Sequence, residues 1–311
     1  MSIPLHLYLP IAGNSVNMLL ILGLGGVVGL LSGIFGVGGG FLMTPLLIMF
    51  GIPPTVAAAS DSNQIVGAST SGTLAHFRLG NVDFKMGLLL LAGGVAGGTV
   101  GVQIISVLRQ LGNADFLITL TYVLMLGIIG FYMFAESLQS MRQSPKKIHA
   151  LGIKKESLYG RIVKTLPWQM EFQRSGVRVS VLMVLALGIL VGVLSAIMGV
   201  GGGFIMVPVM VYMLRMPMHV VVGTSLFQIL FTCINVTIMQ AWRNHTVDFV
   251  LALVLLIGSS FGAQLGARLG RKLRGDQLKI LLASLVLVVM VKMLYELLAR
   301  PDVLLAYVGG H

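Results

Sequence analysis

Hydrophobic stretches long enough to span, or nearly span, a lipid bilayer follow one another along most of the chain. They lie at 16–35, 55–77, 84–107, 115–135, 178–198, 218–241, 247–267 and 277–299, with shorter ones at 41–50 and 203–214. Because a helix needs about 20 apolar residues to cross the hydrocarbon, the long stretches predict transmembrane helices. The two short stretches each follow a glycine-rich break and predict half-helices.

One long polar stretch, 136–177, separates these segments into two groups. It divides the chain into a first transmembrane repeat (1–135), a basic linker (136–177) and a second transmembrane repeat (178–311). Apolar residues recur at helical spacing inside the linker at Leu158, Ile162 and Leu166. This spacing suits a short helix lying on anionic lipid, and a solvated linker is an equal alternative.

The two halves repeat each other. Residues 29–45 read GLLSGIFGVGGGFLMTP and residues 192–208 read GVLSAIMGVGGGFIMVP, so 12 of 17 positions match without a gap. The match resumes after a two-residue shift, where Asp83-Phe84 corresponds to Asp248-Phe249. Three glycines at four-residue spacing follow in each half: Gly93, Gly97 and Gly101, then Gly258, Gly262 and Gly266. A duplication of this extent predicts that both halves share one fold.

The composition excludes a water-soluble protein. The 311 residues are 56% hydrophobic and 10% charged, whereas a soluble domain carries about 25% charged residues. The net charge of +11 comes from basic residues in the gaps between apolar runs, which is the pattern of positive-inside loops. A basic face on a folded module, as nucleic-acid binding requires, is not visible, so we expect no nucleic-acid partner.

Loop charges predict the orientation. The linker is basic, and so is the loop at 268–279, which places both on the cytoplasmic side. The counterpart of that loop in the first half, 108–114, contains only Arg109. Because equivalent loops of the two halves differ in their basic charge, they should lie on opposite sides of the membrane. Each repeat must then cross the membrane an odd number of times. The predicted fold is therefore an all-α polytopic membrane protein with two inverted-topology repeats, each a Gly-broken helix plus three spanning helices. Both termini then face outside, unless the half-helices enter and leave on one side.

The glycine-rich breaks are the first candidate site. Four glycines in five positions destabilise a helix by about 1 kcal/mol each relative to alanine, and unwound backbone inside a membrane lines a cavity or is buried in protein. Broken helices at matching positions of inverted repeats are typical of a substrate site at the bilayer midplane. Free amides at the half-helix starts attract anions. The candidates are Gly38, Gly39, Gly40, Phe41, Gly201, Gly202, Gly203 and Phe204. The alternative is that these glycines only allow close helix packing, which is the role we expect for the glycines at four-residue spacing.

Polar residues inside two spans are the second candidate site. Side chains this polar in a membrane segment face the bundle interior or a water-filled cavity, and hydroxyls and amides can bind an oxyanion without carrying charge. The candidates are Ser62, Asn63, Gln64, Thr224, Ser225 and Gln228. Hydrogen bonding between helices is the alternative.

Two charged residues lie well inside predicted spans. Asp61 lies about two helical turns into its segment and Lys292 about two turns from the end of the last one. Both are candidates for coupling: they could pair, Asp61 could accept a transported proton, and Lys292 could attract the anion. For Lys292, snorkelling to the interface is the alternative.

Motifs of catalysis and cofactor binding are scarce. The chain has no His-Glu-x-x-His, no Cys/His spacing for a metal and no phosphate loop. Its single cysteine, Cys233, lies in an apolar run. We therefore expect no enzyme activity and no cofactor, and a driving force that comes from an ion or proton gradient.

The duplicated Gly-Val-Gly-Gly-Gly-Phe blocks, with the Gly-Thr-Ser-Leu element at 223–226, resemble the TauE/SafE sulfite exporter-like family, also called the 4-toluene sulfonate uptake permease family. The resemblance covers both halves. It implies a multi-pass protein of the cytoplasmic membrane that carries sulfite, a sulfonate or a related organosulfur anion. Where this family tends to have a Gly-Thr-Ser-like element in the first half, the chain has Ser-Asp-Ser at 60–62.

The expected function is thus secondary transport of a sulfur-containing anion by alternating access, with the lipid bilayer and a small anion as partners. Two alternatives remain: a non-transporting membrane protein (an assembly factor or an intramembrane enzyme), and a cation transporter that uses Asp61. Association into a homo-oligomer stays open.

Overall fold

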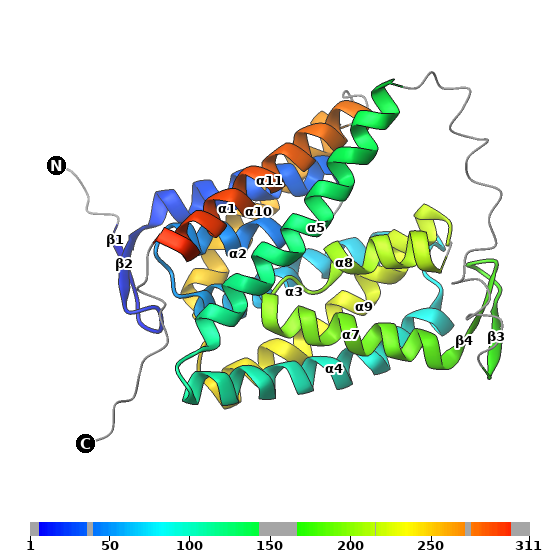
Figure 1. Ribbon diagram of the computed structural model, residues 1–311, viewed down its shortest axis with the longest axis horizontal. Coiled ribbons are helices and arrows are strands. Elements are labelled where there is room, and N and C mark those ends of the chain that lie inside the picture. Colours follow the sequence, from blue (N-terminus) through cyan, green and yellow to red (C-terminus); the bar gives the residue numbers. More distant parts are fainter. Residues whose placement is uncertain (1–5, 36–39, 143–166, 215, 271–274, 300–311) are drawn as a thin grey trace.

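The computed structural model describes residues 6–35, 40–142, 167–214, 216–270 and 275–299, and in these ranges the chain is a bundle of helices (Figure 1). The first half contains β1 (His6–Leu9), β2 (Asn14–Asn17), α1 (Met18–Phe35), α2 (Gly40–Met49), α3 (Pro54–Arg78), α4 (Phe84–Gln110) and α5 (Ala114–Arg142). The second half contains β3 (Gln169–Phe172), β4 (Val177–Ser180), α7 (Val181–Met198), α8 (Gly203–Pro208), η1 (Val209–Met213), α9 (Met218–Met239), η2 (Gln240–Asn244), α10 (Phe249–Gly270) and α11 (Gly275–Ala299). The order of hairpin, broken helix and three long helices is therefore the same in both halves.

The apolar segments of the sequence coincide with these helices. In the described part of the chain, α4, α5, α7, α9 with η2, and α10 are long and apolar enough to cross a membrane. The half-helix α2 is a shorter apolar helix, as predicted. Pro208 ends α8 and is followed by the wide π-turn η1.

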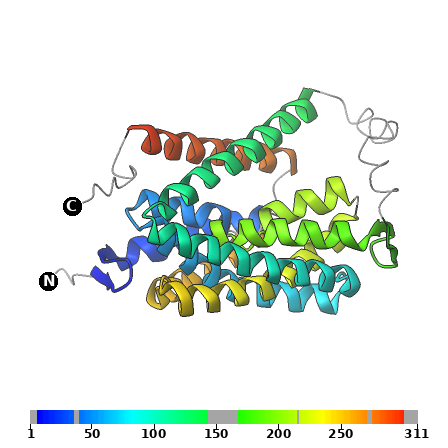
Figure 2. The ribbon, with the colours of Figure 1, turned by 60° about the horizontal axis from the view of Figure 1, so that its bottom comes forward.

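The helices pack mainly across the two halves. The most extensive contacts join α1 to α10 and α4 to α7, and further extensive pairs join α3 to α9 and α5 to α11. Figure 2 shows α5 and α11 side by side over one face of the remaining helices. Each pair takes one helix from each half, so the sequence repeats interlock rather than forming separate bodies.

Glycines permit the two closest helix pairs. A Cβ added at Gly93 would meet the backbone of α7 at Leu185, and one at Gly97 would overlap the Ile189 carbonyl. In the second half, Cβ atoms at Gly258 and Gly262 would meet the backbone of α1 in the same way. The predicted packing role of these glycines is therefore confirmed: small residues let two membrane helices approach closely.

The close approach of α4 and α7 predicts a destabilising effect for Gly97→Ala. The new methyl group would force the two backbones apart, which we expect to cost about 1–3 kcal/mol, measured as a lower midpoint of thermal unfolding in detergent. Gly127→Ala on α5 is the matched control, because its Cβ would make only ordinary contacts of 3.9 Å with Met290. Equal effects of the two substitutions would contradict this role of Gly97.

The polar stretch between the halves is more structured than its composition indicates. α5 continues to Arg142, and residues 169–180 form the antiparallel hairpin β3–β4, in which Gln169 pairs with Ser180. The predicted amphipathic segment at Leu158, Ile162 and Leu166 lies outside the described residues. A hairpin here has an equivalent in β1–β2, where His6 pairs with Asn17. Both hairpins lead directly into the first helix of their half.

Each hairpin binds an aspartate of the opposite half. Asp83 caps α4 by accepting from the Met86 amide, and its Oδ2 accepts from the Ser175 amide (3.1 Å) and hydroxyl (2.6 Å) in the β3–β4 turn. Its own amide donates to Thr224 Oγ1 on α9.

The equivalent Asp248 has matching partners. It caps α10 through the Leu251 amide and accepts from the Ile11 amide in the β1–β2 turn, while its own amide donates to Ser60 Oγ on α3. We call these two arrangements the aspartate clamps. The two hairpins lie at opposite ends of the bundle (Figure 1), so the clamps tie the halves together at both ends.

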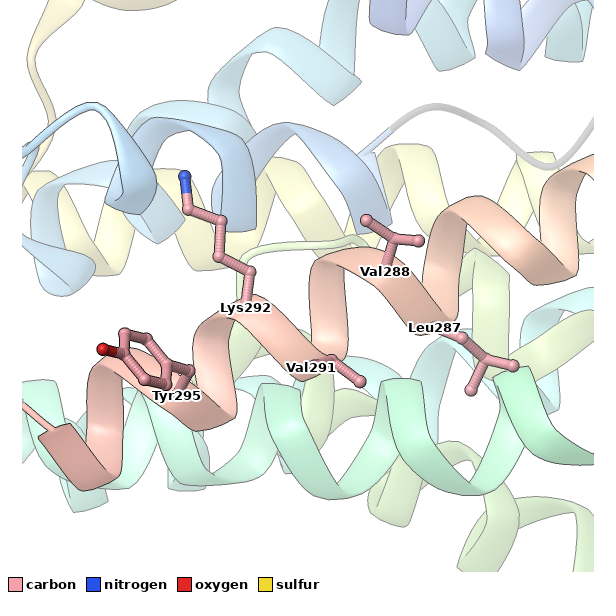
Figure 3. A pocket seen from close by; sticks show the side chains of 5 residues that line it. All are labelled: Leu287, Val288, Val291, Lys292 and Tyr295. Carbon is pink, nitrogen blue, oxygen red and sulfur yellow. The ribbon is translucent and has the colours of Figure 1, made fainter.

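The outer face of α11 carries a shallow apolar hollow (Figure 3). It is lined by Leu287, Val288, Val291, Lys292 and Tyr295. Lys292 is half-exposed and its Nζ lies 4.0 Å from Glu296 Oε1, one helical turn further along. Its partner is thus on the same helix.

Candidate functional site

The second glycine-rich break interrupts the helix as predicted. α7 ends at Met198, and Gly199, Gly201 and Gly202 all have left-handed backbone conformations, with φ of 71°, 70° and 75°. α8 then begins at Gly203. Glycine adopts this conformation without the steric cost that other residues meet, which explains the residue type at these positions. In the first half α1 ends at Phe35 and α2 begins at Gly40; Gly38 and Gly39 lie outside the described residues.

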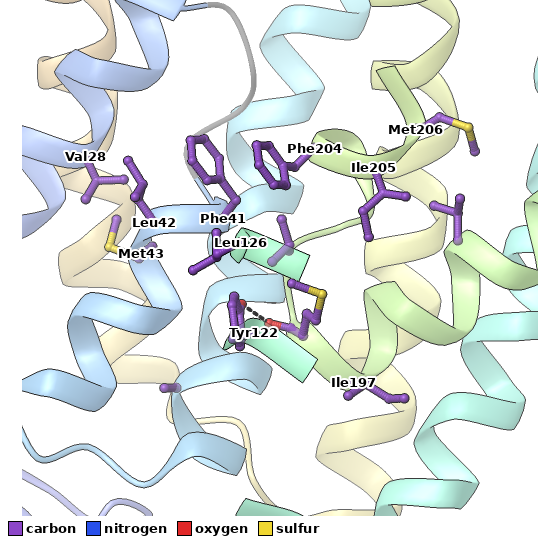
Figure 4. Close-up of a cluster of buried hydrophobic side chains, with 14 of the residues drawn as sticks. Val28, Phe41, Leu42, Met43, Tyr122, Leu126, Ile197, Phe204, Ile205 and Met206 are labelled. Atoms are coloured by element: carbon purple, nitrogen blue, oxygen red, sulfur yellow. Dashed lines mark hydrogen bonds between the residues drawn. The ribbon is translucent and has the colours of Figure 1, made fainter. Parts of the chain in front are cut away.

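The starts of the two half-helices meet. Phe41 in the first turn of α2 and Phe204 in the first turn of α8 stack face to face, with ring centroids 4.3 Å apart and an angle of 5° between the planes (Figure 4). Both rings are almost completely buried. The structure therefore brings together Gly40 and Phe41 with Gly203 and Phe204, four residues that the sequence singled out from segments 163 positions apart in the chain.

The second break is also closely packed. A Cβ at Gly199 would overlap the Ala58 carbonyl of α3, and one at Gly201 would lie 2.7 Å from Cys233 Sγ and Ile229 Cγ2 on α9. At Gly202 it would lie 2.5 Å from Val191 Cγ1 of α7. The glycines of this break therefore both interrupt the helix and allow close packing. The alternative interpretation, that they allow close helix packing, is thus correct for part of their role.

The polar residues of α3 face different neighbours. Ser62 Oγ bonds the carbonyls of Ala58 (3.1 Å) and Gly199 (3.2 Å), which joins α3 to the second break. Gln64 Nε2 donates to Ser259 Oγ on α10 at 2.6 Å. Asn63, between them, is half-buried. Of these three, Ser62 is the residue that bonds a glycine-rich break.

The polar residues of α9 mostly bond protein groups. Thr224 Oγ1 accepts from the Asp83 amide at 3.0 Å, and Ser225 Oγ bonds the Val222 carbonyl of its own helix. Gln228 Nε2 donates to Thr232, while its Oε1 is buried without a partner. Ser195 Oγ, three residues before the end of α7, is likewise buried without a partner. Buried polar atoms of this kind need an explanation, such as a ligand or an ordered water.

Asp61 lies between the two broken helices. It is fully buried, and its Oδ2 accepts from Thr44 Oγ1 on α2 at 2.8 Å. A Cβ at Gly40 would lie 3.3 Å from the same oxygen, which places the carboxyl group against the first turn of α2. Its second oxygen, Oδ1, has no hydrogen-bond partner. The structure does not bring Lys292 to this group, because that side chain bonds Glu296 on the half-exposed face of α11.

Sequence reasoning missed Tyr122, which joins this cluster from α5. It is fully buried, its hydroxyl donates to the Met198 carbonyl at the end of α7 (Figure 4), and it lies beside Asp61 and Thr44. A tyrosine in the middle of an apolar span could have been noticed, because a buried phenol hydroxyl usually has a partner. Thr44 thus connects Asp61 to the half-helix α2, and Tyr122 connects this cluster to the end of α7, next to the second break.

Comparison with known proteins identifies relatives over most of the chain. A family profile described as "Sulfite exporter TauE/SafE" matches residues 21–293. The "Probable membrane transporter protein YunE" of Bacillus subtilis is 26% identical over 296 residues, which cover 91% of this chain and 98% of the relative. The "Probable membrane transporter protein YjnA" of the same organism is 26% identical over 277 residues, covering 88% of this chain and 97% of the relative.

A plant protein matches a shorter segment. "Sulfite exporter TauE/SafE family protein 5" of Arabidopsis thaliana is 44% identical over 54 residues, which cover 17% of this chain and 12% of the relative. No solved structure gives a significant match.

Proposed function

Because the chain belongs to the sulfite exporter TauE/SafE family, we propose that it is a secondary transporter that moves a sulfur-containing anion across the cytoplasmic membrane. The substrate is sulfite, a sulfonate or a related organosulfur anion. The observation that carries this proposal is the stacking of Phe41 on Phe204, which places the starts of two half-helices together inside the bundle. Unpaired amides and the positive end of the helix dipole make such starts suitable for an anion.

The substrate occupies the space that opens when the stacked rings separate. The glycine-rich breaks then offer their amides from Gly38 to Phe41 and from Gly201 to Phe204. Ser62, Asn63, Gln64, Thr224, Ser225 and Gln228 add neutral hydrogen bonds. Gln64 and Thr224 bond other helices in the closed bundle, so they reach the anion only after those helices shift.

Alternating access follows from an inverted arrangement of the two repeats. The location of the equivalent hairpins β1–β2 and β3–β4 at opposite ends of the bundle supports this arrangement (Figure 1). Repeats that rock about a fixed midplane site open it to one side at a time. The basic linker, 136–177, marks the cytoplasmic side.

Reconstitution in liposomes tests the proposal. Purified protein should carry labelled sulfite and labelled toluenesulfonate into vesicles faster than protein-free vesicles take them up, and unlabelled sulfonate should compete. Flux of a cation without anion flux would favour the cation alternative. Turnover of lipid or peptide without flux would favour an intramembrane enzyme. Either outcome would contradict the proposal.

The ring stack predicts a measurable effect of Phe204→Leu on this flux. Leucine keeps an apolar side chain but loses the aromatic pairing, which contributes about 0.5–1.5 kcal/mol, so we expect sulfonate flux to change several-fold at unchanged protein yield. The matched control is Phe131→Leu on α5, whose ring is 70% exposed. Identical flux in both variants would show that transport does not depend on the ring stack.

A further inference from the structure

We infer that Asp61 couples anion transport to protons, binding one proton on its unpartnered oxygen in each transport cycle. This inference rests on the proposed transport of a sulfur-containing anion. It starts from the combination of a fully buried carboxyl group, an Oδ2 that accepts from the Thr44 hydroxyl, and an Oδ1 without a partner. The carboxyl group lies against the first turn of α2, next to the residues that we assign to the anion.

The groups around Asp61 supply no counter-charge. α2 contributes the Thr44 hydroxyl, and the other titratable groups that face Asp61 are Tyr122 of α5 and Cys233 of α9. α10 presents Asp248, which bonds the neighbouring Ser60. Among the described side chains, no Lys, Arg or His is paired with Asp61.

The neighbouring backbone acts on a charge at Asp61 in two opposite directions, because the first turn of α2 carries the positive end of that helix and the end of α7 carries a negative one. Tyr122 and Ser62 bond the carbonyls of Met198 and Gly199 at the end of α7, so the negative end of that helix points toward the same region. Removing a charge from water without a partner costs several kcal/mol. Protonation of Oδ1 turns the carboxylate into a neutral carboxylic acid and removes this cost.

The closed state of the bundle is therefore energetically favourable when Asp61 carries a proton. In the outward- or inward-open state, water reaches the carboxylate and a proton is exchanged with that side of the membrane. A proton and a monovalent anion cross together, with no net charge moved. Asp61 corresponds to Thr224 in the second half, which has no ionisable group, so one proton crosses per cycle.

The test uses a sulfonate in liposomes, because its charge is the same at every pH used. With one proton per anion, a gradient of one pH unit should support roughly tenfold accumulation of labelled toluenesulfonate, independent of membrane potential. The Asp61→Asn variant should lose this accumulation and still exchange internal for external sulfonate at equal pH. Asp115→Asn is the matched control, because Asp115 bonds the Thr55 amide at the start of α3 and asparagine keeps an acceptor oxygen for this bond. This variant should accumulate sulfonate like the unaltered protein.

A second measurement does not depend on any variant. In vesicles of the unaltered protein, an inward gradient of toluenesulfonate should acidify the interior, as reported by an internal pH dye. Exchange without acidification would overturn the inference while leaving the proposed transport intact, as would accumulation driven by a sodium gradient at equal pH. Accumulation by Asp61→Asn at the level of the unaltered protein would also overturn it. Absence of any sulfonate or sulfite movement in the unaltered protein would instead contradict the proposed function itself.

Discussion

Substitution of Gly199 by alanine is expected to abolish transport and to destabilise the folded protein by about 3 kcal/mol or more. Two costs add at this position. The backbone has φ of 71°, where a Cβ costs about 1–2 kcal/mol. The same Cβ would overlap the Ala58 carbonyl oxygen, a backbone atom of α3 that cannot move without displacing the helix, and overpacking of this kind costs about 1–3 kcal/mol.

Gly51→Ala separates these two costs. Gly51 also has a left-handed conformation, with φ of 84°, but nothing lies within 4 Å of its added Cβ. We expect it to show the conformational cost alone and to retain transport. Thermal unfolding in detergent and toluenesulfonate flux are the two measurements. If Gly199→Ala is no more harmful than Gly51→Ala, close contact between the second break and α3 is not required for the fold.

The helices and the break were predictable because their signals are local. A run of apolar residues favours a helix wherever it lies, and four glycines within five positions, at 199 and 201–203, disfavour a continuous one. The repeat then indicated that Phe41 and Phe204 occupy equivalent places, and their stacking agrees with two half-helices that meet. Whether the two repeats are inverted, and which side the linker faces, stay predictions.

The partners of the polar residues were not predictable, because sequence gives the depth of a residue but not the direction in which its helix faces. Thr224 and Gln64 had the right type and depth for an anion site, yet in the structure they bond the Asp83 amide and Ser259. For Lys292 the helix is apolar around its whole circumference, so no periodicity could show that the side chain lies on the outer face.

The hairpins were missed for a related reason. The β3–β4 segment lies at the end of a basic stretch, and basic composition suggested a linker. Its fold depends on a distant residue, since Ser175 in its turn bonds Asp83. One part of this arrangement was readable: an aspartate directly before an apolar helical run is a typical helix N-cap, and the sequence has one in each half at Asp83 and Asp248.

Removal of the Asp83 clamp should destabilise the protein and open one end of the bundle. Asp83→Ala leaves the Met86 amide and both polar groups of Ser175 without their acceptor, and each buried group left unpaired costs about 1–3 kcal/mol. We expect a loss of about 3 kcal/mol or more in the free energy of unfolding. Asp83→Asn, which keeps one acceptor oxygen, should show an intermediate loss, because its amide nitrogen cannot accept from Ser175.

Opening of this end can be detected through Cys233, the chain's single cysteine, which is fully buried and lies against Gly201 of the second break. A maleimide that cannot cross membranes should label Cys233 in Asp83→Ala vesicles when added on the β3–β4 side. The Asp248 clamp ties down the other end through Ile11, so Asp248→Ala should permit labelling from the β1–β2 side. Each variant serves as the control for the other, because both lose an equivalent helix cap. Asp83 and Asp248 are equivalent in the two halves and differ in the end of the bundle at which they lie. Labelling of both variants from the same side would therefore contradict clamps that close opposite ends.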